Sequence, residues 1–83
     1  MPKSTHTPEY RVLRELLREL REREGVLQAD LAERLGVPQS YVSKSENGER
    51  RLDVLEVREW CRGLEVSFAE FSKELDRRLR RLS

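Results

Sequence analysis

The sequence predicts an all-α domain of five helices. Apolar residues repeat at intervals of three and four, the spacing that places side chains on one face of an α-helix. Cap residues and glycines separate these repeats at short intervals, as in a bundle with tight connections. The chain has 83 residues, of which 36% are hydrophobic, enough for one small core. We therefore expect a flexible N-terminal tail at residues 1–7 and a single domain at residues 8–83.

The first helix should run over residues 8–24. Thr7 offers a hydroxyl cap, and Pro8 suits the first turn, where its missing N–H needs no partner. Gly25 is placed to end the helix. The other faces alternate arginine and glutamate, as on a solvated helix surface. The expected buried stripe consists of Leu13, Leu16, Leu17 and Leu20.

Two short helices should follow at residues 28–35 and 38–47. Leu31, Ala32 and Leu35 form the apolar side of the first, and Gly36 is expected to close it in a left-handed conformation. Val42 is the clear anchor of the second helix, which ends at Gly48.

The last two helices should begin after Asp53 and Ser67. Asp53 is the expected cap of the fourth helix, and Ser67 with Glu70 forms the pattern of a capping box for the fifth. The fifth helix extends toward the C-terminus, with an apolar repeat formed by Phe68, Phe71, Leu75, Leu79 and Leu82.

Composition excludes several classes of function. The longest apolar runs are two or three residues, so we expect no membrane span and a cytoplasmic protein. Cys61 is the only cysteine and His6 the only histidine, so no disulfide, zinc site or Cys/His nucleophile can be assembled. Cys61 is expected to be a core residue. No paired carboxylates or phosphate-binding glycine loop point to an enzyme, and we expect no cofactor or small-molecule ligand.

Residues 37–51 favour nucleic-acid recognition. Two short helices joined by a glycine-containing turn have the geometry that lets the second helix enter a major groove. Neutral hydrogen-bonding side chains occupy the exposed positions of that second helix, and such groups can read base edges while charges mainly position a protein. A net charge of +1 argues against a general polycation, so recognition must depend on local arrangement.

The chain resembles the Cro/repressor-type (XRE-like) helix-turn-helix family of phage and bacterial transcriptional regulators. The segment "LRELREREGVLQADLAERLGVPQSYVSKSENGERRLD" carries the resemblance, which extends over about Leu13 to Leu75. It implies a five-helix, lambda-repressor-like domain that binds operator DNA as a dimer, with its third helix in the major groove. It also implies association with the nucleoid through DNA.

The resemblance assigns roles within this segment. Gln28 would touch a phosphate and brace the recognition helix. Base edges would be read by Gln39, Ser40, Ser43 and Lys44. The DNA backbone would be held by Tyr41, Asn47, Arg50 and Arg51. The chemistry agrees, because glutamine can bond bidentately to adenine and lysine can donate to guanine. Partial packing remains an alternative for Tyr41, and solubility of a loop for the two arginines.

The family also pairs an arginine late in the first helix with a glutamate late in the third, positions held here by Arg21 and Glu46. Three residues depart from its pattern. Ser45 stands where an apolar core residue is usual, whereas Leu27 and Pro38 leave two helix starts without a side-chain acceptor.

Trp60, Leu75, Leu79 and Leu82 either complete the core or form a dimer contact. The function we expect is sequence-specific repression of transcription by a homodimer on a palindromic operator. Two alternatives remain. Small chains of this family also serve as antitoxins, which bind a toxin and repress their own operon. The domain could instead be an interaction module that has lost DNA binding and docks a larger protein.

Overall fold

The computed structural model describes residues 6–82, which form five helices and no strand. The helices are α1 (Pro8–Arg23), α2 (Gln28–Leu35), α3 (Gln39–Asn47), α4 (Val54–Gly63) and α5 (Phe68–Arg80). The all-α prediction is confirmed, and each helix starts within one residue of its predicted position. Residues 1–5 of the expected tail lie outside the described residues. Within residues 6–82, no helix has the length and apolarity to cross a bilayer.

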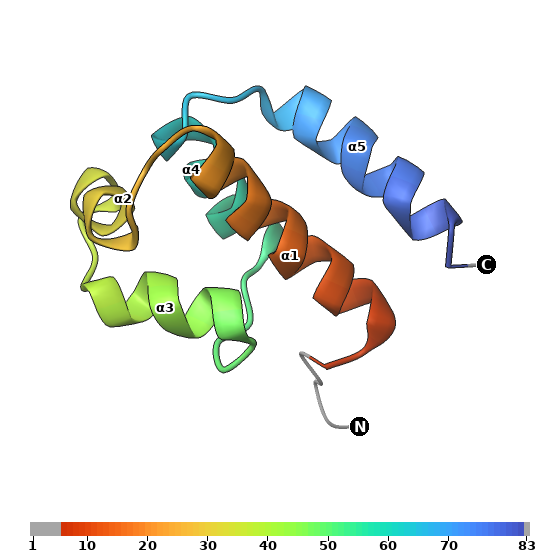
Figure 1. The fold of residues 1–83 in the computed structure, drawn as a ribbon, viewed down its shortest axis with the longest axis horizontal. Coiled ribbons are helices and arrows are strands. Elements are labelled where there is room, and N and C mark those ends of the chain that lie inside the picture. The colour runs from red at the N-terminus through yellow and green to blue at the C-terminus, as the bar shows by residue number, and fades with distance from the viewer. Residues whose placement is uncertain (1–5, 83) are drawn as a thin grey trace.

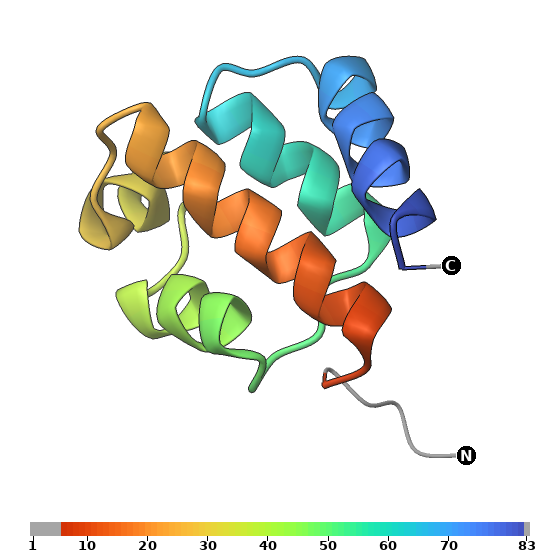
Figure 2. The same ribbon diagram turned by 45° about the vertical axis from the view of Figure 1, so that its right-hand side comes forward.

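Helix α1 lies in the middle of the domain (Figures 1 and 2). In both views α3 and α5 lie on opposite sides of it, and α1 contacts each of them. Helix α2 packs against α3 and α4, and α4 packs against α5. Helix α1 therefore lies between α3, the second helix of the helix-turn-helix, and the C-terminal helix α5.

The core receives buried side chains from all five helices. Its largest fully buried side chains are those of Trp60, Leu16, Leu17, Leu31, Leu64, Val42, Cys61 and Ser45. Trp60 is 0% exposed, so it completes the core and offers no surface to a second copy of the chain; its assignment as a dimer contact is corrected accordingly. Burial raises the pKa of the Cys61 thiol to about 11, which keeps it neutral, as expected of a core residue.

Local hydrogen bonds explain where the helices begin. Thr7 Oγ1 accepts from the Tyr10 amide at 3.1 Å. Asp53 and Glu56 form a complete capping box, with the two bonds at 2.8 and 2.9 Å. At α5 the serine half of the expected box is present, because Ser67 Oγ accepts from the Glu70 amide at 3.1 Å. These bonds satisfy amides that have no partner within their own helix.

The predicted weak starts of α2 and α3 are confirmed. Neither Leu27 nor Pro38 makes a side-chain cap bond. At α2 the Asp30 carboxylate compensates in part, since it accepts the Leu27 N–H at 3.3 Å.

Two glycines permit close geometry around α2. Gly36 ends the helix with φ +71°, the left-handed conformation predicted for the turn. A side chain at Gly63 would place its Cβ 2.9 Å from Leu31 and 3.1 Å from Leu35. The crossing of α2 and α4 therefore depends on the absence of a side chain at Gly63.

Ser45 faces the core, as predicted. It is 1% exposed, and its hydroxyl donates to the Tyr41 carbonyl oxygen at 2.6 Å. The buried hydroxyl thus finds its acceptor within α3 itself.

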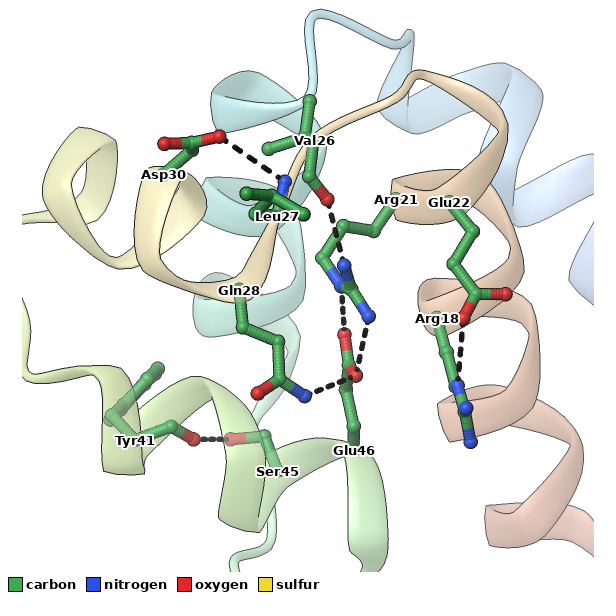
Figure 3. Close-up of polar contacts among 10 residues, drawn as sticks. All are labelled: Arg18, Arg21, Glu22, Val26, Leu27, Gln28, Asp30, Tyr41, Ser45 and Glu46. Carbon is green, nitrogen blue, oxygen red and sulfur yellow. Dashed lines mark hydrogen bonds and ion pairs between the residues drawn. The ribbon is translucent and has the colours of Figure 1, made fainter.

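A buried ion pair joins α1 to α3, which confirms the predicted pairing of Arg21 and Glu46 (Figure 3). Arg21 Nε and Nη2 donate to the two carboxylate oxygens at 2.5 and 3.1 Å. Arg21 Nη1 also donates to the Val26 carbonyl at 2.7 Å, and Gln28 Nε2 donates to Glu46 at 2.9 Å. Both charged residues are only 7% exposed. The Glu46 carboxylate connects α3 to α1 and α2, and Arg21 also holds the turn between α1 and α2.

We expect Arg21→Ala to lower the free energy of unfolding by about 3 to 5 kcal/mol, because it leaves the Glu46 carboxylate buried without its cation. Chemical denaturation followed by circular dichroism measures this change.

The double substitution Arg21→Met with Glu46→Leu is the matched control. It removes both charges, so it should cost less than Arg21→Ala alone. A melting temperature that Arg21→Ala leaves unchanged would contradict the structural role of the pair.

Candidate nucleic-acid interface

Helix α3 has one buried and one exposed face. Val42, Ser45 and Glu46 are buried against the rest of the domain. On the other side Gln39, Ser40 and Lys44 are exposed, and Ser43 is half-buried. The four side chains expected to read bases thus lie on a ridge that is accessible to a ligand.

Gln28 connects α2 to this ridge. Its amide nitrogen donates to Glu46 Oε1 at 2.9 Å, which is the bracing part of its predicted role (Figure 3). Because Glu46 is itself held by Arg21, the position of α3 relative to α2 is fixed before any ligand binds.

The loop after α3 carries Arg50, which is held by two contacts. Its guanidinium lies 4.4 Å from the centre of the Tyr41 ring, a cation–π arrangement. Arg50 Nη2 also pairs with Glu56 Oε2 at 2.9 Å. The arginine is therefore presented at the surface in a defined position next to the recognition helix.

Tyr41 is both a platform and a hydrogen-bond donor. Partial burial raises the pKa of its phenol, and the nearby Glu56 carboxylate adds to the shift. The hydroxyl is therefore protonated at neutral pH and can donate to an anion such as phosphate.

Arg51 is placed in a similar way by Tyr10 of α1. The guanidinium lies 4.9 Å from the centre of the Tyr10 ring. The Tyr10 hydroxyl accepts from the buried Leu52 amide at 2.8 Å, which joins the loop to α1. Two tyrosines from different helices thus position two adjacent arginines.

Asn47 takes part in the turn that follows α3. Its side-chain nitrogen donates to Glu49 at 2.8 Å, and its oxygen accepts from the Glu49 amide at 3.1 Å. A DNA contact by Asn47 would therefore have to compete with the Glu49 carboxylate.

The leucines predicted to complete the core or form a dimer contact lie away from α3. Leu75 and Leu79 of α5 are half-buried and Leu82 is 47% exposed, and α5 is on the opposite side of α1 from α3 (Figure 1). Within residues 6–82, no group of three or more histidine, cysteine, aspartate or glutamate residues could hold a metal ion.

Sequence reasoning missed Tyr10, Glu56 and Arg14 as residues that shape this surface. Arg14 Nη1 donates to the Glu46 carbonyl oxygen at 3.0 Å. A signal existed for Arg14, because Arg14, Arg18 and Arg21 are spaced by four and three residues and so share one face of α1. For Tyr10 and Glu56 the partners are distant in sequence or in a loop, where no periodicity indicates them.

Comparisons with known proteins agree with this geometry. A family model described as helix-turn-helix matches residues 17–71. The solved structure of an XRE-family like protein from Pseudomonas syringae pv. tomato str. DC3000 is 46% identical, covers 86% of this chain and 87% of its own, and superposes with a TM-score of 0.81. None of the curated proteins matches the chain.

The restriction-modification controller protein C.Esp1396I is also similar. Its wild-type structure is 24% identical, covers 89% of this chain and 97% of its own, and has a TM-score of 0.82. A second structure shows its tetramer in complex with its natural 35 base-pair operator. It is 25% identical, covers 87% of this chain and 95% of its own, and has a TM-score of 0.79.

We expect Tyr10→Phe to reduce stability by about 1 to 3 kcal/mol, because the buried Leu52 amide loses its acceptor. Tyr41→Phe is the matched control, since Tyr41 is only half-buried and removal of its hydroxyl should change stability less. Thermal melts of both variants give the comparison, and equal losses would argue against a special role for the Tyr10 bond.

Proposed function

We propose that this chain, which belongs to the XRE family of helix-turn-helix proteins and is a DNA-binding transcriptional regulator, represses transcription as a homodimer bound to a palindromic operator. The observation that carries the proposal is the α3 ridge. The inner face of α3 is fixed by the Arg21–Glu46 pair, while Gln39, Ser40 and Lys44 are exposed on its outer face.

The ridge residues suit base recognition in the major groove. Gln39 can donate to and accept from adenine in a bidentate pair, and Lys44 can donate to guanine O6 and N7. Ser40 and Ser43 can act as donor or acceptor with several bases. We assign these four side chains to base contacts.

The loop residues suit the DNA backbone. Arg50 and Arg51 are exposed and lie over tyrosine rings, so little side-chain freedom is lost when they meet a phosphate. Tyr41, Asn47 and Gln28 are the further residues that we assign to backbone contacts.

An apolar groove on the α5 side supports self-association. It has a volume of about 250 Å³ and includes Leu13, Val54, Phe68 and Leu75 in its lining. Val54 is 65% exposed, which is costly for a large apolar side chain next to such a groove in a monomer. A second copy packed there would bury Val54 and Leu75, and we assign Leu79 and Leu82 to the same two-fold contact. Among similar proteins, the operator complex of the C.Esp1396I controller contains a tetramer.

A dimer would place two copies of α3 in successive major grooves, about 34 Å apart on one face of the duplex. Selection of bound duplexes from a random pool tests this arrangement. We expect a palindromic consensus whose half-sites are about one helical turn apart. A non-palindromic consensus would contradict the symmetric dimer, and no binding at low salt would favour a protein-interaction module.

We expect Gln39→Ala and Lys44→Ala each to relax the preference at particular base pairs by about 1 to 3 kcal/mol. Arg50→Ala should weaken binding to all duplexes alike, because phosphates carry no sequence information. Affinities for the selected duplex and for single-base variants of it measure both effects. Uniform losses from all three substitutions would contradict this division of roles.

A further inference from the structure

A polar groove runs between α1 and α3 and contains two arginines to which no DNA contact has been assigned above. It has a volume of about 320 Å³ and is lined by Arg14, Arg18, Gln28, Ser43, Glu46 and Asn47. Gln39, Ser43 and Asn47 recur every four residues along α3, so the groove is continuous with the ridge. Tyr41 and its stacked Arg50 lie on the other flank of the helix.

Arg14 is held in place at the edge of this groove. Its Nη1 donates to the Glu46 carbonyl oxygen at 3.0 Å, near the C-terminus of α3. Its Nε is buried and has no hydrogen-bond partner among the described residues. An arginine has five N–H donors, and because Nε is buried, the donors that can meet a ligand are those of the terminal Nη atoms.

Arg18 is the more accessible of the two arginines. Its side chain is 62% exposed, and its Nε pairs with Glu22 Oε2 at 3.1 Å within α1 (Figure 3). Exposed pairs of this kind add little stability. The guanidinium can therefore exchange Glu22 for a stronger anion at small cost.

The groove has an excess of positive charge. Its one carboxylate, that of Glu46, is already bonded by Arg21 at 2.5 Å and by Gln28 at 2.9 Å. Arg14 and Arg18 are thus the charges left to attract a ligand, and paired arginine forks match the geometry of a phosphate.

We propose that Arg14 and Arg18 bind a phosphate of the DNA backbone on the side of α3 opposite to Arg50 and Arg51. The inference rests on the proposed function. A helix in the major groove lies between two phosphate chains, so basic groups on both flanks of α3 would hold it from both sides.

Arg18→Ala tests the proposal, with Arg62→Ala as a matched control. Arg62 also forms an exposed ion pair within one helix, with Glu59, and its substitution removes the same charge. The side chain of Arg18 is 62% exposed and that of Arg62 is 70% exposed. Arg62 belongs to the last turn of α4, and the ribbon shows that end of α4 away from α3 (Figure 2). We expect Arg18→Ala to weaken binding to a random-sequence duplex several-fold and to make the slope of log affinity against log salt shallower by about one, with Arg62→Ala near wild type.

Glu22→Gln should act in the opposite direction. It removes the carboxylate that competes for Arg18, so affinity should rise, whereas Glu59→Gln should change it little. Circular dichroism melts of all four variants separate these effects from unfolding.

The outcomes distinguish the two proposals. If the wild-type protein binds no duplex at low salt, the proposed function fails and this inference fails with it. If the wild type binds and Arg50→Ala weakens binding, but Arg18→Ala behaves like Arg62→Ala, the α1 site alone is overturned. A rise in affinity on Glu22→Gln no larger than that on Glu59→Gln would also count against it.

Discussion

The buried pair between Arg21 and Glu46 is the constraint on which the arrangement of the first three helices depends. A carboxylate that is 7% exposed needs its cation and its hydrogen bonds, and these come from α1 and α2. The placement of α3 in the structure satisfies all of them together. The same bonds that neutralise a buried charge therefore set the orientation in which the outer face of α3 meets a ligand.

The surface around α3 is built in the same manner, by residues that fix other residues. Tyr41 and Tyr10 support the two loop arginines, and Arg14 reaches the end of α3 from α1. The two loop arginines and Gln28 are thus positioned by side chains from helices outside their own segments. These residues lose little conformational freedom on binding, which matters in a chain whose net charge is only +1.

The sequence predicted the helices well because their signals are local. Thr7, Asp53 and Ser67 cap the helices that they were expected to cap, and the pairing of Arg21 with Glu46 followed from a family resemblance. Contacts set by the packing were harder to predict. The bond from the Leu52 amide to Tyr10 spans 42 residues, and nothing in the apolar pattern distinguishes a fully buried tryptophan from one at an interface.

The Glu56 carboxylate has two partners: one oxygen closes the capping box of α4, and the other pairs with Arg50. The first turn of α4 also carries Val54, which lines the groove assigned to self-association. A phosphate that draws Arg50 away would change the bonds at that turn. If the chain dimerises through this groove as proposed, occupancy of the operator and assembly of the dimer would be thermodynamically linked, and by reciprocity each would alter the affinity of the other.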